Sequence, residues 1–337
     1  MRKRISVAGV IFAILGHLLP ASAASAQACQ DYFDRAKGAV SGNSADLKAL
    51  RELTGQVRNS QECTELDKTC FSYLVADTVA ALVSSADGGK PVAKLVELAR
   101  EAFMTAPTWR AAWAWAHEFE KEKNYDEASL LYQRAYAAIA DVKARISFRH
   151  RGSFVCAGEG EQLPPSSDED ELARLAVQTN ALATKFVEPP PTRCGAAGPE
   201  DVLRVGCGAE ARIPLPVDFE TGSAKLTDKG RTAVAFLVRY LRAQGAEAGP
   251  FVLTGHSDQR GSARRNCQLS KRRLDAVVAQ LRQSGIGSDF NIEPIAMGSR
   301  DPFSVVGEKG YRQDQIDRIN RRVELRSSAP AGGRCAQ

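Results

Sequence analysis

The chain has 337 residues, 44% of them hydrophobic and 25% charged, which is ordinary globular composition and enough length for two domains. Its 45 basic and 40 acidic residues give a formal charge of +5, but Arg2, Lys3 and Arg4 lie in a terminal segment of their own. Without that segment 42 basic residues face 40 acidic ones, a charge of +2. This balance argues against a protein that binds nucleic acid through a strongly basic domain.

Residues 1–28 have the pattern of a secretory signal peptide. The basic MRKR is followed by the apolar stretch ISVAGVIFAILGHLL and by small residues that suit a cleavage site. The apolar stretch is too short for a typical membrane span. Cleavage after Ala28 would leave Cys29 at the mature N-terminus, so a lipid on Cys29 is an alternative, although Ala26 stands where such a motif usually has a larger aliphatic residue.

The eight cysteines all lie after residue 28. An even number of cysteines in an exported chain predicts disulfide bonds, but the sequence does not choose among the pairings. No C-x-x-C pair occurs, so we predict no zinc site.

Residues 29–157 are predicted to form an all-α domain. From Ser44 to Ile146, alanine, leucine, glutamate and lysine recur at helical spacing. The segment 88–91 and Pro107 interrupt this pattern, so several helices are expected.

Part of this domain resembles a tetratricopeptide repeat. Within 110–139, large and small residues alternate as that repeat requires, at Trp115, Ala116, Phe119, Ala128, Tyr132 and Ala135. The repeat's usual opening aromatic and closing proline are missing, and a second unit upstream is degenerate. Because stable stacking needs about three repeats, a plain helical bundle with Trp113, Trp115 and Tyr132 in its core remains the alternative.

Residues 158–203 are predicted to be a linker with one helix. Two stretches rich in proline, glycine and acidic residues flank a helical pattern from Glu169 to Phe186, and neither stretch can pack a core.

Residues 204–328 alternate between strand and helix patterns. The expected strands are 211–219, 251–257, 290–298 and 321–326. Thr227 caps the first expected helix, Gly285 ends the second, and a polar helix covers 313–319. The order βαβαβ plus a last helix and strand predicts a two-layer α+β domain, followed by a tail over 329–337.

Five blocks of this region resemble the OmpA-like peptidoglycan-binding domain, which also occurs in peptidoglycan-associated lipoproteins and flagellar stator proteins. In order and spacing, the blocks are VDFETGSAKLT, TGHSDQRG, NCQLSKRRLDAV, AMGSRDP and INRRVEL. The resemblance covers about residues 211–327.

The resemblance implies non-covalent binding of the diaminopimelate in the peptidoglycan stem peptide, with Asp258 and Arg273 as the essential pair. This ligand carries an ammonium and a carboxylate on its second amino-acid centre. Aspartate can accept hydrogen bonds from the ammonium, and arginine can donate two parallel N–H bonds to the carboxylate. The alternative is an ordinary surface ion pair between Asp258 and Arg273.

Further residues are predicted to belong to this ligand-binding site. They are Gly255, Ser257, Asn266, Leu269, Ser270, Arg321 and Arg322. Because neighbours alternate along a strand, Arg321 and Arg322 should lie on opposite faces, one bordering the pocket and the other paired on the surface.

The surroundings of this site depart from the family's usual pattern. The rim is unusually basic, with Arg260, Arg264, Arg265, Lys271 and Arg272. If Cys267 forms a disulfide bond, that bond would tether the recognition helix close to the site.

Taken together, we expect a non-enzymatic periplasmic protein, associated with the cell wall and located in one version at the inner face of the outer membrane. It would anchor the helical domain, or the outer membrane, to peptidoglycan. The expected partners are peptidoglycan and an envelope protein bound by the helical domain, with no nucleic acid, no cofactor and no transmembrane span in the mature chain. The alternative is a periplasmic scaffold of tetratricopeptide type in which protein–protein interaction is the main role and wall binding is secondary.

Overall fold

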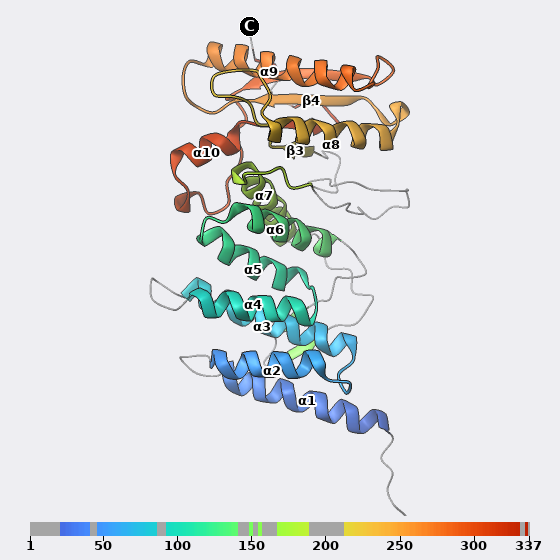
Figure 1. The fold of residues 1–337 in the computed structure, drawn as a ribbon, viewed down its shortest axis with the longest axis vertical. Helices are drawn as coiled ribbons and strands as arrows, with labels where there is room; N and C mark the ends of the chain where they lie inside the picture. The colour runs from blue at the N-terminus through green and yellow to red at the C-terminus, as the bar shows by residue number, and fades with distance from the viewer. Residues whose placement is uncertain are drawn as a thin grey trace, which may run out of the picture.

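A computed structural model of the chain describes residues 21–40, 46–85, 92–140, 148–150, 154–156, 167–188, 212–330 and 334–335. Figure 1 shows two parts arranged along the long axis of the molecule: a pile of helices and, at its C-terminal end, a sheet with its own helices. The two parts correspond to the two sequence patterns described above.

The pile contains α1 to α7. Their bounds are Ala21–Val40, Leu47–Asn59, Glu65–Ser85, Val92–Thr105, Trp109–Lys121, Tyr125–Ala140 and Ser167–Leu182. Helix α1 runs across the expected cleavage point after Ala28, and cleavage there stays a prediction.

Local sequence signals account for the way these helices begin and pack. Asp46 accepts hydrogen bonds from two backbone amides at the start of α2, and Thr108 accepts one from the Ala111 amide at the start of α5. Along α2, Leu50, Leu53 and Val57 follow 3,4 spacing and are buried in the core of the pile.

Helices α5 and α6 form the hairpin in which the tetratricopeptide-like pattern lies. Ala112 and Ala116 of α5 share a buried cluster with Ala128 and Tyr132 of α6, so small residues face large ones across the pair. The assignment to that repeat family stays a prediction.

Helix α7 begins at Ser167, inside the segment predicted to be a linker, and packs as the last layer of the pile. Leu172, Ala173 and Ala176 belong to the same buried cluster as Tyr132 and Tyr136 of α6. A short antiparallel pair, β1 (Phe148–His150) with β2 (Phe154–Cys156), was not predicted.

The C-terminal part is the predicted two-layer α+β domain, and its element order is confirmed. The strands are β3 (Arg212–Leu215), β4 (Phe251–His256), β5 (Ile292–Gly298) and β6 (Val323–Arg326), in the sheet order β3-β6-β4-β5. Strands β4 and β5 pair in parallel, and the other pairs are antiparallel. The helices are α8 (Asp228–Gln244), α9 (Ala263–Gln283) and α10 (Gln313–Asn320), with single 3-10 turns at Ala246–Ala248 and Glu308–Gly310.

Alternation along the strands separates the two faces of this sheet. Leu253 of β4 and Leu325 of β6 join a core with Leu237 of α8 and Val277 of α9, so both long helices cover one face. The intervening residues, Thr254 and Glu324 among them, point to the opposite face and are also buried.

The two parts meet where α7 lies against α10. Val177 and Leu182 of α7 pack against Phe303 and Ile319. The ammonium of Lys229, at the start of α8, donates to the carbonyl oxygens of three residues at the C-terminal end of α7, namely Asn180, Ala181 and Ala183. This arrangement satisfies carbonyl groups that a helix end leaves without partners.

Disulfide bonds join described cysteines in both parts of the fold. Cys29 bonds to Cys63, and Cys267 bonds to Cys335. No described cysteine is free. A sulfur already bonded to Cys63 has no thiol to carry a lipid, so this structure contradicts the lipidated alternative for Cys29. Across the described ranges, none of the helices combines the length and the apolar character that a membrane crossing requires.

Candidate functional site

The site forms at the carboxyl end of β4, in the middle of the sheet. Directly after the strand, the backbone amide of Ser257 donates to the carbonyl of Gly298 at 2.8 Å, which holds the turn against the end of β5. Asp258 follows and is only 8% exposed. The fold therefore places one acidic side chain, nearly buried, at the end of a central strand.

The Asp258 carboxylate is held by two arginines. Its Oδ2 accepts from Arg321 Nη1 at 2.7 Å and from Arg260 Nη2 at 3.0 Å, and its Oδ1 accepts from the Arg260 backbone amide at 3.1 Å. Burial raises the pKa of Asp258, but these hydrogen bonds and the Arg321 charge outweigh burial, so the pKa lies below its ordinary value. The side chain is a stable anion at neutral pH.

Side chains from the turn between β4 and α9, and from the first turn of α9, stabilise that turn by hydrogen bonds. Ser262 caps α9 by accepting from the Arg265 amide, and Asn266 in the first turn donates to the Asp258 carbonyl at 3.1 Å. Gly261 has a φ of 89°, which a side chain would disfavour. Asn266 therefore fixes the backbone on which Asp258 stands.

Arg273 lies inside the domain, on the face of α9 that it shares with Asn266 and Ser270. It is 4% exposed, its Nε donates to the Ser223 carbonyl at 3.0 Å, and its guanidinium lies 5.0 Å from the centre of the Phe219 ring. Its Nη1 is buried and has no hydrogen-bond partner among the described residues. Burial first, and then the nearby Arg321 charge, lowers the pKa of Arg273 to about 10.

Asp258 and Arg273 make no ion pair with each other within the described part of the chain. The alternative of an ordinary surface ion pair is therefore wrong for this structure, because both side chains are buried and the acid is paired elsewhere. The Asp258 charge is near enough to act on the pKa of Arg273, and Arg273 keeps a donor without a partner among the described residues.

Four other predicted site residues lie in or next to the region where α9 packs on β4. A Cβ atom added to Gly255 would lie 3.0 Å from the Ser270 carbonyl, so the two backbones approach at this point. The Ser270 hydroxyl donates to the Cys267 carbonyl at 2.9 Å and accepts from the Gly298 amide at 3.1 Å. Leu269 is half-buried on α9, and the Ser257 hydroxyl donates to the Asp258 carbonyl at 3.2 Å.

Arg321 and Arg322 are separated as strand alternation predicts, but Arg322 is not paired on the surface as expected. Arg321 reaches Asp258, whereas Arg322 is buried on the opposite face, where its Nε donates to Glu324 at 2.7 Å and its guanidinium lies over the Phe303 ring. The prediction was wrong because the segment after β5 covers that face of the sheet.

His256, Asp301 and Glu324 bring potential metal-ligand atoms within 4.8 Å of one another on this second face. Arg322 and Arg326 also contact Glu324, at 2.7 and 3.4 Å. Two guanidinium groups already compensate the carboxylate, so this cluster is a buried charge network that suits the packing of the sheet better than a further cation.

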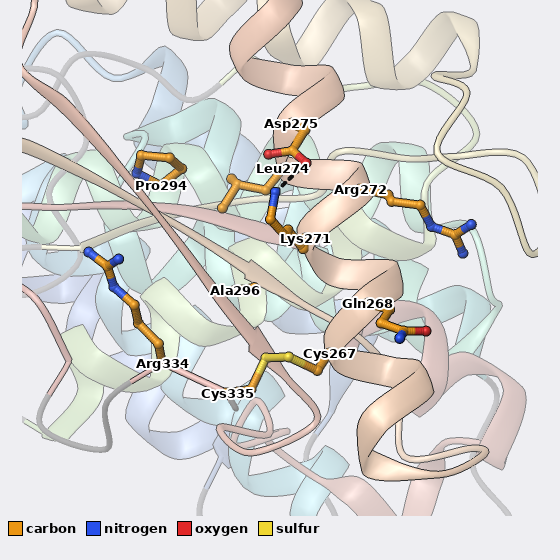
Figure 2. A pocket seen from close by; sticks show the side chains of 10 residues that line it. All are labelled: Cys267, Gln268, Lys271, Arg272, Leu274, Asp275, Pro294, Ala296, Arg334 and Cys335. Carbon is orange, nitrogen blue, oxygen red and sulfur yellow. Dashed lines mark hydrogen bonds and ion pairs between the residues drawn. A yellow bond between two sulfur atoms is a disulfide. The ribbon is translucent and has the colours of Figure 1, made fainter. Parts of the chain in front are cut away.

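A hollow lies beside the site, between α9, the edge strand β5 and the C-terminal tail. Figure 2 shows the Cys267–Cys335 disulfide bond at one end of it, with Lys271, Pro294 and Arg334 around it, and its volume is about 650 Å³. The Cys335 amide donates to the Ala296 carbonyl at 3.0 Å, so the tail is fastened to the edge of the sheet. Cys267 and Lys271 lie on a different face of α9 from Asn266, Ser270 and Arg273.

Sequence reasoning missed three neighbours of the site. Phe219 and Ser223 contact Arg273 from the segment after β3, and Asp317 of α10 pairs with Arg260 at 3.0 Å. Phe219 and Ser223 do fall within the first of the five family-like blocks, whereas nothing in the local pattern around Asp317 signals its contact.

Comparison with known proteins identifies the family of this region. A family model described as "OmpA family" matches residues 218–313. No curated protein sequence matches the chain. Solved structures that are similar include the OmpA-like domain of FopA1 from Francisella tularensis subsp. tularensis SCHU S4, with 23% identity, a TM-score of 0.28, and 36% of this chain and 73% of that chain covered.

Two further solved structures have the same range of similarity. The peptidoglycan-associated lipoprotein from Burkholderia pseudomallei has 22% identity and a TM-score of 0.27, with 33% of this chain and 86% of that chain covered. The cell wall anchor of the T6SS from Pseudomonas aeruginosa has 24% identity and a TM-score of 0.27, with 36% of this chain and 82% of that chain covered.

Proposed function

Because residues 218–313 form an OmpA-family domain, we propose that this protein binds peptidoglycan non-covalently through the site between β4 and α9. The moiety bound is the second amino-acid centre of diaminopimelate in the stem peptide. Asp258 receives its ammonium, and Arg273 receives its carboxylate.

One observation carries this proposal. Arg273 is buried, yet its Nη1 has no partner within the described residues, although a buried donor without an acceptor costs about 1 to 3 kcal/mol. A ligand carboxylate would remove that cost. It would also form a charge-assisted pair in a place where little water competes.

The environment of Asp258 supports its proposed role as the partner of the ligand ammonium. Asp258 stays ionised, since its pKa is lowered, and it is not neutralised by Arg273. A ligand with both charges can therefore contact both side chains at once. Lysine, which replaces diaminopimelate in other cell walls, has no second carboxylate and would leave Arg273 unpaired.

The proposed role is binding without chemical turnover. A carboxylate held ionised by two arginines is suited to be a counter-ion, because a general acid or base needs a pKa near the working pH. The helical pile would then be the part that is anchored. Export to the periplasm, and recruitment of an envelope protein by the helical pile, belong to the same proposal.

The test is a pull-down of the protein on purified diaminopimelate-type peptidoglycan, with lysine-type peptidoglycan as the comparison. We expect Asp258→Asn and Arg273→Gln each to weaken binding by about tenfold or more, since each removes one charged hydrogen-bonding partner. Arg282→Gln is the matched control, because Arg282 is exposed in the last turn of the same helix.

Equal retention of all variants on both walls would contradict the proposal. That result would mean that the basic rim adheres to an anionic polymer. The scaffold alternative, in which the helices carry the activity, would then be the better account.

A further inference from the structure

We propose that Arg260 is an internal counter-ion that occupies Asp258 while the site is empty, and that Asp317 is the positioning residue that keeps Arg260 when a ligand ammonium displaces it. The inference rests on the proposed function, because it concerns how the same site exchanges its own cation for that of the ligand.

Arg260 bridges two carboxylates. Its Nη2 lies 3.0 Å from Asp258 Oδ2, and its Nε lies 3.0 Å from Asp317 Oδ2. Asp317 belongs to α10, whereas Arg260 and Asp258 belong to the turn after β4. One guanidinium therefore connects the ligand-binding acid with a helix from another part of the domain.

Of the two arginines on Asp258, Arg260 is the one that can leave. Its side chain is 66% exposed, against 25% for that of Arg321. Arg321 is also held by its backbone, since it is the C-cap residue of α10 and its amide donates to the carbonyls of Asp317 and Arg318. A ligand arriving from solvent therefore meets Arg260 first.

Asp317 can keep Arg260 in an ion pair after Arg260 has released Asp258. Its side chain is 3% exposed, its Oδ1 accepts from Gln313 at 3.0 Å, and Arg260 is its cationic partner among the described residues. Stripping the partner from a buried carboxylate is strongly destabilising. Arg260 can release Asp258 through Nη2 while Nε stays on Asp317, so the exchange leaves no buried charge alone.

This arrangement makes the site selective for a ligand with both charges. A ligand that has only a carboxylate can pair with Arg273 but cannot replace Arg260 on Asp258. A ligand with an ammonium substitutes one cation for another, and the charge balance at Asp258 is kept.

The experiment measures the dissociation constant of a soluble tripeptide ending in diaminopimelate, using the full chain and titration calorimetry. We expect Arg260→Gln to bind about two- to fivefold more tightly, which is the range of an exposed ion pair. Asp317→Asn should bind more weakly, because Arg260 then has only Asp258 as a partner. In the Arg260→Gln background, Asp317→Asn should have no further effect.

A spectroscopic readout separates this role from a merely structural one. By NMR titration of the free protein, Arg260→Gln should raise the pKa of the Asp258 carboxyl, since a hydrogen bond from Arg260 is among the causes that lower it. Arg282→Gln removes the same charge from the last turn of α9 and should change neither the affinity nor the pKa of Asp258.

Three results would overturn the inference. Weaker binding by Arg260→Gln would make Arg260 a direct ligand contact. An unchanged affinity, or an unchanged pKa of Asp258, would show that Arg260 does not act as its counter-ion. A loss caused by Asp317→Asn even without Arg260 would mean that Asp317 acts by another route. Failure of the proposed function looks different, because then Asp258→Asn and Arg273→Gln would not change binding at all.

Discussion

Single residues in this site carry opposite charges that the fold keeps apart. The end of β4 positions Asp258, and the third turn of α9 positions Arg273, whose Nε is engaged by the Ser223 carbonyl. Arg321, and not Arg273, pairs with Asp258, at 2.7 Å. Because Arg273 is oriented by a neutral carbonyl and an aromatic ring, its remaining donor is pre-organised. Among the described residues it holds no ion pair that an incoming anion would have to break.

The ionised state of Asp258 predicts a pH dependence of stability. Its pKa is lower in the folded than in the unfolded protein, so near pH 4 the unfolded state binds more protons and the free energy of unfolding falls as the pH falls. The contribution is fully present above the unfolded pKa and is lost as the pH passes down through the folded one. Asp258→Asn should therefore flatten the acid limb in urea unfolding between pH 7 and pH 3. A parent and variant that lose stability in parallel would contradict this assignment.

At the scale of elements, two faces of α9 make different contacts. One face carries Asn266, Ser270 and Arg273 toward the candidate site, and another carries Cys267 toward the C-terminal tail. The tail contacts β5, the edge strand of the sheet, through the Cys335 amide. Covering an edge in this way protects it from pairing with other chains. Pro294 has no amide hydrogen to offer there and adds to the same protection.

The bridge between α9 and the tail should stabilise the domain measurably. Cys267→Ser/Cys335→Ser opens a covalent link across 68 residues, and we expect the free energy of unfolding to fall by about 2 to 4 kcal/mol. Guanidinium denaturation followed by circular dichroism checks this value. Wall binding at low denaturant should persist, since the bridge lies on another face of α9 than Arg273.

The matched control removes the Cys29–Cys63 bond in the helical pile. Cys29→Ser/Cys63→Ser opens the link between α1 and the segment before α3, far from the sheet in Figure 1. If both double variants shift the same transition equally, the disulfide bonds act on the chain as a whole, and the local role given to Cys267–Cys335 is wrong.

At the scale of the whole molecule, polar contacts fasten the helical pile to the C-terminal domain. Gln178 of α7 donates to the Tyr311 hydroxyl at 2.7 Å, and Gln315 of α10 donates to the Tyr125 hydroxyl at 2.6 Å. The Tyr311 hydroxyl also donates to Glu120 of α5. The pile is thereby joined to α10, the helix that also carries Asp317 and ends at Arg321.

A substitution at Lys229 tests how much its hydrogen bonds to α7 contribute to joining the two parts of the molecule. Lys229→Met keeps the aliphatic stem but leaves buried carbonyls of α7 without their donor, and we expect the free energy of unfolding to fall by about 1 to 3 kcal/mol. Calorimetry should show the parent unfolding in one transition and the variant in two. The exposed Lys225→Met is the control. A variant that still unfolds in a single transition, with unchanged stability, would mean that the apolar α7–α10 contact suffices.

Much of the fold was accessible from the sequence because it depends on neighbours along the chain. The order of strands and helices in the C-terminal domain and the Thr227 cap follow from local sequence signals and were confirmed. Asp258 and Arg273 could be proposed as a pair because blocks that resemble the OmpA family surround them, and a model of that family matches residues 218–313.

Only the tertiary structure decided which charges meet. Asp317 is adjacent to Arg260, Arg322 is buried with Glu324, and α7 belongs to the pile, because folding brings together segments that no periodicity connects. The sequence by itself determined which face of each helix and strand is apolar, since the polarity of a side chain and its spacing along the chain do not depend on the fold. The choice of partner for each buried charge depends on distances across the fold, and those distances exist only once the sheet, α9 and α10 have packed.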